Sequence, residues 1–156
     1  LSVGDVDAYY QRAFEELDLD IPGDLRLRAA RATQGSPYML QLIGYNIGNR
    51  CKTGEHVTPE QVDGAIEASK ADFENDVCET TLAALSDQDV AFLDAMTDDE
   101  DAVSRISDVA KRMSVTPDYA QKYRRRLIDA GVIEQARRGY VRFAVPYMAD
   151  YLRSQL

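Results

Sequence analysis

The stretch SVTPDYAQKYRRRLIDAGVI, residues 114–133, contains the start and stop signals of one helix. Thr116 followed by Pro117 is typical of an N-cap and a first helical residue, and Gly131 stands where helices end on a left-handed residue. Helical spacing assigns the inward face to Ala120, Tyr123 or Arg124, Leu127 and Ala130. The residues left on or near the open face are Asp118, Tyr119, Gln121, Lys122, Arg125 and Arg126. The stretch therefore predicts an amphipathic helix with a basic, hydrogen-bonding outer surface.

The flanking sequence places this helix in a larger motif. Residues 87–96 and 103–113 have apolar side chains at helical spacing, and SVTP is typical of the turn before a third helix. Residues 132–136 and 140–145 predict two short strands around a glycine-containing turn, and Pro146 predicts the start of a last helix. Helix, helix, turn, helix and β-hairpin within about 60 residues is the order of a winged helix-turn-helix.

The first half of the chain predicts helices only. Residues 5–17 have one apolar face, and Asp24 is expected to cap a second helix that runs to Gly35. The apolar face of the first helix is formed by Val6, Tyr9, Tyr10, Ala13, Phe14 and Leu17.

Two more helix starts follow. Ser36 and Pro37 are typical of an N-cap and a first-turn proline. Thr58 and Gln61 form the Gln version of a capping box at the start of a long helix.

A new cap at Ser86-Asp87 and a change in composition indicate a boundary between two domains. We expect a helical domain over residues 1–85 and a winged-helix domain over residues 86–156. The predicted fold class is mainly α, with a helical bundle followed by a winged helix-turn-helix that carries a small β-hairpin.

Composition limits the class of protein. With 156 residues, 45% of them hydrophobic, the chain can fold into one ordinary domain or two small ones. No apolar run approaches the length of a membrane span, and no membrane partner is expected. Cys51 and Cys78 are too few for a disulfide framework, which favours a reducing cytoplasm. The chain begins almost inside an amphipathic segment, so we expect it to be a piece of a longer protein.

Charge is distributed unevenly along the chain. The formal net charge is −9, and residues 1–85 contain 7 Lys and Arg against 15 Asp and Glu. Residues 102–156 contain 11 Lys and Arg against 5 Asp and Glu. The local excess of positive charge favours contact with phosphates, while the acidic remainder weakens it.

The basic surface predicts binding to double-stranded DNA. Arginine can bridge guanine edges or hold phosphates, glutamine can pair with adenine, and arginines at a hairpin tip can touch the backbone or minor groove. The candidate DNA-binding residues are Tyr119, Gln121, Lys122, Arg125, Arg126, Arg137 and Arg138. The alternative is an ordinary solvated face, or a winged helix that packs on protein.

Other chemistry finds little support. His56 is the only histidine, and Cys51 and Cys78 form no C-x-x-C pair. The acidic run DDED at 98–101 lacks the spaced ligands of a calcium loop, so a solvated loop is expected. We therefore expect no catalytic residue and no metal site.

The two halves together resemble the C-terminal part of P-loop ATPases of the AAA+ and STAND kind, a helical lid followed by a winged helix. The likeness covers nearly the whole chain, and its lid signal is the sequence ATQGSPYMLQLIGYNIG at 32–48. The resemblance implies that Gly35, Ser36, Pro37 and Tyr38 lie near a bound nucleotide, where a helix N-terminus favours anions. The arginine that many such lids carry early in this helix is absent here.

The resemblance also implies a missing part. The chain has no G-x-x-x-x-G-K-[ST], so ATP and Mg²⁺ would belong to the parent protein, whose ATPase core would precede Leu1. The favoured hypothesis is a non-catalytic C-terminal fragment whose winged helix binds DNA or regulates the missing ATPase core. One alternative is a protein-interaction or autoinhibitory winged helix without DNA binding. Another is a free-standing winged-helix transcription regulator with an effector pocket under Tyr9, Tyr10 and Tyr38.

Overall fold

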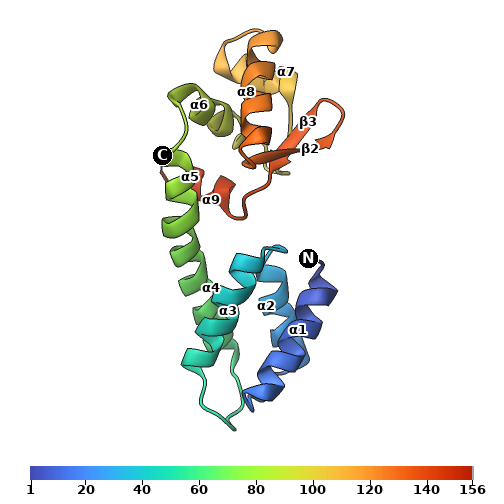
Figure 1. Ribbon diagram of the computed structural model, residues 1–156, viewed down its shortest axis with the longest axis vertical. Helices are drawn as coiled ribbons and strands as arrows, with labels where there is room; N and C mark the ends of the chain where they lie inside the picture. Colours follow the sequence, from blue (N-terminus) through green and yellow to red (C-terminus); the bar gives the residue numbers. More distant parts are fainter. Residues whose placement is uncertain (156) are drawn as a thin grey trace. The chain divides into compact units, whose positions relative to one another are not determined.

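The computed structural model describes residues 1–155 and divides into two compact units (Figure 1). The N-terminal unit is Leu1–Phe73, and the C-terminal unit runs from Glu74 to the end of the chain. The predicted fold class is confirmed, because the chain is mainly helical and carries a small antiparallel sheet.

The N-terminal unit is a helical bundle. Its helices are α1 (Val3–Glu16), α2 (Gly23–Ala32), α3 (Pro37–Arg50) and α4 (Pro59–Phe73). Their buried faces contribute Val6, Tyr10, Phe14, Leu25, Ala29, Met39, Ile43, Ile47, Val62 and Ala65 to one core. Polar groups inside it are paired: the Tyr10 hydroxyl donates to the Leu40 carbonyl at 2.7 Å, and the Asn46 amide donates to Ser69 Oγ at 2.9 Å.

Two helix starts in this unit are confirmed. Ser36 Oγ accepts the Met39 N–H at 3.3 Å, so it is the N-cap of α3. Thr58 and Gln61 form a reciprocal capping box, with bonds of 2.9 and 3.2 Å. These bonds join residues three apart, which is why the local sequence predicts them.

Two other expectations for this unit are wrong. Asp24 does not cap α2: the helix begins at Gly23 with Pro22 in the cap position, and Asp24 lies in the first turn. Tyr9 and Leu17 do not join the core, and both remain exposed on α1.

The C-terminal unit begins with a π-helical segment and ends with a short helix. Its elements are η1 (Glu74–Cys78), α5 (Glu79–Ala83), α6 (Asp87–Met96), β1 (Val103–Arg105), α7 (Ile106–Met113), α8 (Pro117–Asp129), β2 (Ile133–Arg137), β3 (Tyr140–Phe143) and α9 (Met148–Ser154). The strands form an antiparallel sheet in the order β1-β3-β2. From α6 to β3 this is the winged helix-turn-helix arrangement that the sequence predicts.

Strand β1 corrects the predicted helix over residues 103–113. Residues Val103–Arg105 pair with β3, with Ser104 opposite Val141, and the helix begins only at Ile106. The Ile106 N–H donates to the Gly139 carbonyl at 3.0 Å, so the first turn of α7 is bonded to the β2–β3 turn. The strand forms because β3 offers a free edge, which local helical spacing does not reveal.

The boundary between the units lies between Phe73 and Glu74, earlier than the predicted boundary between residues 85 and 86. The long helix predicted after Thr58 changes to π-helical geometry in η1. Cys78 in η1 is buried, and its Sγ lies 3.8 Å from the Pro146 carbonyl oxygen. This packing near the start of α9 makes η1 and α5 part of the C-terminal unit.

Two smaller expectations also differ. The last helix begins at Met148, because Tyr147 has a left-handed backbone with φ of 61°. Ala130, expected in the core, is exposed at the end of α8.

Candidate nucleic-acid interface

Helix α8 exposes the basic face that the sequence predicts. Thr116 Oγ1 accepts the Tyr119 N–H at 3.2 Å and caps the helix, and Pro117 is its first residue. The buried side of α8 consists of Ala120, Tyr123 and Leu127. Lys122 and Arg125 lie exposed, one turn apart. The outer face of α8 is therefore open to a partner.

Arg126 makes a structural contact instead. Its Nε and Nη2 donate to the two carboxylate oxygens of Asp89 on α6, at 3.1 and 2.9 Å. The Asp89 side chain is 1% exposed, and the Arg126 side chain is 54% exposed. Ser86 also donates to this carboxylate, through its N–H at 3.1 Å and its hydroxyl at 2.8 Å. These donors, Arg126 first, lower the pKa of Asp89 to about 2 against the opposing effect of burial.

Two tyrosines lie beside these cations. The hydroxyls of Tyr119 and Tyr123 are 3.3 Å apart, and Tyr119 is exposed. Lys122 Nζ lies 5.5 Å from the centre of the Tyr123 ring, within cation–π range. Gln121, also a predicted contact, is half-buried. Tyr119 and Gln121 are the two uncharged residues of α8 that are predicted to contact DNA, and Tyr119 is the more exposed of them.

The β2–β3 turn presents the predicted wing arginines. Gly139 adopts a positive φ of 79°, which the turn requires. The Arg137 guanidinium stacks on the Tyr140 ring, with its Cζ 4.0 Å from the ring centre. Arg138 is exposed at the same turn. The stacking therefore fixes the position of the Arg137 guanidinium in the absence of DNA.

Sequence reasoning missed two basic residues of this surface. Arg105 is exposed on β1, directly opposite Tyr140 in the sheet register, and was assigned to a helix. Arg124 was considered for the core, but it is half-buried and its Nη2 donates to Gln135 Oε1 at 3.2 Å. A strand prediction for Val103–Arg105 would have found the first.

The basic residues of the winged helix fall into two groups. Arg112, Arg126, Arg142 and Arg153 form ion pairs with carboxylates. Within residues 1–155, no ion pair is formed by Arg105, Lys111, Lys122, Arg124, Arg125, Arg137 or Arg138. The second group carries the positive charge that remains free to act on a polyanion.

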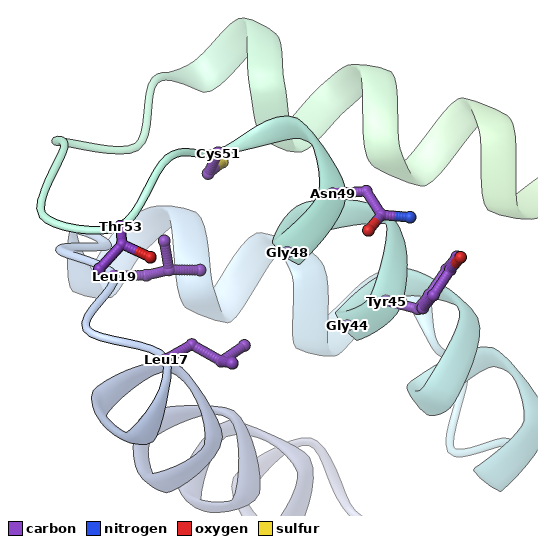
Figure 2. Close-up of a pocket in the computed structure, with 8 residues that line it drawn as sticks. All are labelled: Leu17, Leu19, Gly44, Tyr45, Gly48, Asn49, Cys51 and Thr53. Carbon is purple, nitrogen blue, oxygen red and sulfur yellow. The ribbon is translucent and has the colours of Figure 1, made fainter.

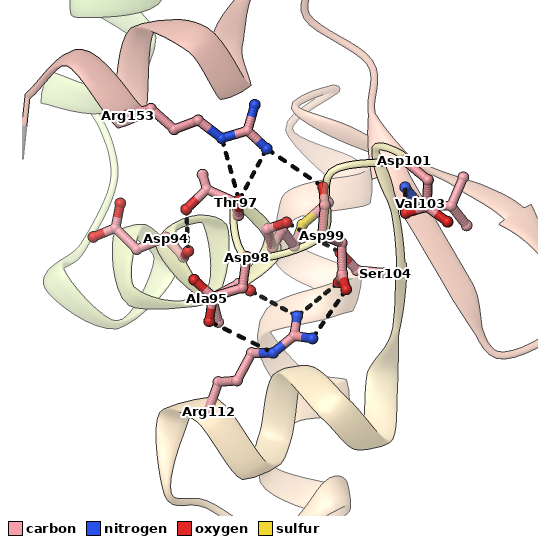
Figure 3. A network of polar contacts seen from close by, with 11 residues as sticks. Asp94, Ala95, Thr97, Asp98, Asp99, Asp101, Val103, Ser104, Arg112 and Arg153 are labelled. Atoms are coloured by element: carbon pink, nitrogen blue, oxygen red, sulfur yellow. Dashed lines mark hydrogen bonds and ion pairs between the residues drawn. The ribbon is translucent and has the colours of Figure 1, made fainter.

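The acidic loop after α6 is held by two arginines (Figure 3). Arg112 donates to both carboxylate oxygens of Asp99, at 2.6 and 2.9 Å, and to the Ala95 carbonyl at 3.0 Å. Arg153 donates to the Thr97 carbonyl at 2.9 and 3.2 Å. The Arg112 hydrogen bonds lower the pKa of Asp99. The loop is thus a bonded structure, and its negative charge is partly compensated.

The turn from Gly35 to Tyr38 forms the start of α3. Gly35 has a φ of 75°, and a Cβ there would lie 2.7 Å from the Leu1 carbonyl oxygen. Ser36 caps the helix, Pro37 occupies its first turn, and the Tyr38 ring meets the Phe73 ring edge-on at 5.8 Å. The Leu1 amino group also donates to the Gly35 carbonyl at 3.3 Å.

The tyrosines proposed for an effector pocket line two hollows. Tyr10 is buried in the core, and Tyr9 lines a hollow of about 230 Å³ beside it. Tyr38 lines another hollow, of about 380 Å³, with Leu42 and Tyr45. Tyr10 also lines the first of these hollows, together with Tyr9.

The thiols and the histidine have different surroundings. Cys51 lines a hollow of about 270 Å³ with Leu17 and Leu19 (Figure 2). Burial raises the pKa of Cys51, and raises that of Cys78 to about 12, so both thiols are protonated at neutral pH. His56 Nδ1 lies 2.8 Å from the Asp20 carboxylate.

Two kinds of feature are absent from residues 1–155. This part of the chain holds no group of three or more His, Cys, Asp or Glu side chains arranged to bind a metal ion. Its helices also include none with the length and apolarity needed to span a bilayer.

Comparison with known sequences places the second half of the chain. The family described as "Domain of unknown function (DUF8462)" matches residues 75–152, which extend from η1 into α9 and amount to half of the chain. No curated protein and no solved structure matches.

Proposed function

The chain belongs to the DUF8462 family, whose description names no function. From the surface of the C-terminal unit we propose that this unit binds double-stranded DNA and catalyses no reaction. Helix α8 would lie in the major groove as the recognition helix, and the β2–β3 turn would serve as the wing. Binding would rest mainly on phosphate contacts, with limited reading of base edges.

One observation carries this proposal: Lys122, Arg125, Arg137 and Arg138 have no carboxylate partner within residues 1–155, whereas Arg126 and other arginines of the unit do. Lys122 and Arg125 lie on one exposed face of α8, and Arg137 and Arg138 lie at the turn. A cation paired within the protein adds little to phosphate attraction, while an unpaired one releases counterions from DNA when it binds. Arg126 belongs to the paired group, and we assign it to holding α8 in place.

Fluorescence anisotropy of a labelled random duplex tests the proposal. We expect binding that weakens steeply between about 50 and about 200 mM salt. Arg125→Glu should lower the affinity by about tenfold or more, because it replaces an attraction with a repulsion. Arg31→Glu is the matched control: Arg31 is exposed on α2, forms no ion pair within residues 1–155, and gives the same change in net charge.

Two results would contradict DNA binding. One is no binding at the lower salt concentration, which would redirect the search to a protein partner of the winged helix. The other is an equal loss of affinity for Arg125→Glu and Arg31→Glu, which would contradict binding through the specific face of α8, because only the net charge would then matter.

The wider context proposed for this unit is a cytoplasmic P-loop ATPase. Its support is the sequence resemblance around Gly35-Ser36-Pro37-Tyr38, together with free thiols at Cys51 and Cys78 that suit a reducing compartment. ATP and Mg²⁺ would bind a core that precedes Leu1 in the parent protein. Sequencing the reading frame ahead of Leu1 tests this: a G-x-x-x-x-G-K-[ST] motif supports it, and a frame without one rejects it.

A further inference from the structure

Helix α3 has an exposed side without charge. Residues 37–49 contain no Asp, Glu, Lys or Arg, although 29% of the chain is charged. Tyr38 and Tyr45 are exposed on this side, Tyr45 by 68%, and Leu42 between them is half-buried. Exposed aromatic side chains on a helix that carries no charge along 37–49 are typical of the centre of a protein–protein interface.

Helix α1 forms the other side of a groove along this surface. Tyr9 and Leu17, both exposed on α1, line hollows of about 230 and about 270 Å³ against Gly44 and Tyr45 of α3. Tyr45 also borders the hollow of about 380 Å³ next to Tyr38. Figure 2 shows Gly44 and Gly48 on successive turns of α3, among the residues that line the hollow with Leu17. We call this groove, lined by Tyr9, Leu17, Tyr38, Leu42, Tyr45 and Gly48, the α1–α3 groove.

Tyr45 borders all three of these hollows. Because the hollows follow one another along α3, the groove suits an elongated occupant better than a compact small molecule. An amphipathic helix is such an occupant, because its side chains at i, i+3, i+4 and i+7 reach successive hollows along one line.

The charges beside the groove define the chemistry of the occupant. Residues 3–18 contain five acids and one base, Arg12. Glu15, Glu16 and Asp18 lie where α1 ends next to Leu17, and their side chains form no hydrogen bond or ion pair within residues 1–155. The last turn of α1 has no basic residue, although a helix C-terminus favours cations. The exposed base Lys52 lies between the lining residues Cys51 and Thr53, but the three acids outnumber it, so this end of the groove attracts positive charge.

We propose that the α1–α3 groove binds an amphipathic helix of a partner protein, with an apolar face toward Tyr45 and Lys or Arg beside Glu15, Glu16 and Asp18. A second copy of this chain fits less well, because its net charge is −9 and its own groove brings the same acids. The proposal concerns the N-terminal unit and is independent of DNA binding.

A display library of helical peptides of about 20 residues, selected against the full chain, tests the proposal. We expect enriched peptides to carry apolar residues at helical spacing and a net positive charge. Tyr45→Ala should weaken their binding by about tenfold or more, as for a central aromatic contact. Glu16→Lys should weaken it as well. Tyr119→Ala, which removes an exposed tyrosine from α8, is the matched control and should have no effect.

Gly48→Ala separates docking from folding. A Cβ at Gly48 would lie 3.7 Å from Leu17 Cδ1, an ordinary contact, and alanine is the better helix former. This variant should therefore raise the melting temperature and still lower peptide affinity, because its methyl group narrows the groove.

Several results would overturn the proposal. They are a library that yields no binder, enriched peptides that are acidic or lack helical spacing, and binders that tolerate Tyr45→Ala. Sedimentation velocity tests whether a second copy of this chain occupies the groove. Self-association that Tyr45→Ala abolishes would assign the groove to a second copy and reject a basic partner helix.

Discussion

Asp89 on α6 and Arg126 on α8 meet through two hydrogen bonds, of 3.1 and 2.9 Å, in which the carboxylate is buried and the guanidinium is half exposed. The same carboxylate accepts two hydrogen bonds from Ser86 at the start of α6. One aspartate therefore caps its own helix and binds the helix proposed to enter DNA. A buried carboxylate without its partner would be costly, so this contact fixes how α8 lies on α6.

Removing the partner of Asp89 should destabilise the protein. We expect Arg126→Ala to lower the free energy of unfolding, because it leaves the buried Asp89 carboxylate without its ion-pair partner. Arg142→Ala is the matched control, since its pair with Glu134 is exposed on both sides, and it should cost at most about 1 kcal/mol. Urea denaturation measures both variants, and equal losses would contradict a special role for the buried carboxylate.

The same pair predicts a pH dependence. The pKa of Asp89 is about 2 in the folded protein, below the value of about 3.9 in an unfolded chain. Because the folded-state pKa is lowered, this stabilisation is fully present above about pH 4 and is lost as the pH falls toward 2. Asp89→Asn should flatten that part of the stability curve measured by urea denaturation. Asp99, whose pKa is also lowered, keeps its own contribution in the variant. An unchanged curve would show that the carboxylate is not stabilised in the fold.

Salt dependence distinguishes contact from positioning. Arg125→Ala should reduce the slope of log K against log salt by about 0.9, the value for one lost phosphate contact, without changing stability. Arg126→Ala should lower affinity and stability but leave the slope unchanged, because its charge is already paired with Asp89. Anisotropy titrations at several salt concentrations measure the slopes. An equal decrease for both variants would identify Arg126 as a phosphate contact.

The stacked wing arginine gives another prediction. Tyr140→Ala removes the ring under Arg137, a contribution of about 0.5–1 kcal/mol, and should lower DNA affinity by roughly two- to fivefold. Tyr140→Phe keeps the ring and should bind as the unchanged protein does, which duplex anisotropy can compare directly. A similar loss for the phenylalanine variant would mean that the hydroxyl, and not the stacking, matters. Circular dichroism of both variants checks that β3 is intact.

Gly131 tests the end of α8. Its φ of 75° is left-handed, and a Cβ there would meet no atom within 4 Å, so only backbone strain opposes a side chain. Gly131→Ala should lower the free energy of unfolding by about 1 kcal/mol, and Gly131→Asn by less, because asparagine tolerates this region. Urea denaturation compares them. No loss in the alanine variant would show that the turn relaxes to another conformation.

Helix starts were predictable because their hydrogen bonds are local. Ser36, Thr58, Ser86 and Thr116 each bond a group three residues ahead, and the structure confirms each of these contacts. Strand β1 was not predictable in this way, because its strand state depends on the edge of β3, far along the chain. The early boundary between the units likewise depends on η1 packing beside Pro146.

The sequence predicts which cations of the candidate interface are exposed, but not which of them form ion pairs within the protein. Helical spacing correctly exposes Lys122, Arg125 and Arg126. Which of these cations is neutralised depends on Asp89, 37 residues from Arg126, and no local pattern links the two. DNA binding and the relation to P-loop ATPases stay predictions from sequence and surface.

The hydrogen bond from the Ile106 N–H to the Gly139 carbonyl can form only after the β2–β3 turn has been synthesised. Helices α7 and α8 are translated before β3, so β1 has no strand to pair with and α7 has no acceptor for its first N–H until the β2–β3 hairpin has been made. Folding of the winged helix is consequently non-local and late. A nascent chain that stops short of Tyr140 would carry the arginines of α8 without the sheet that orients its helices.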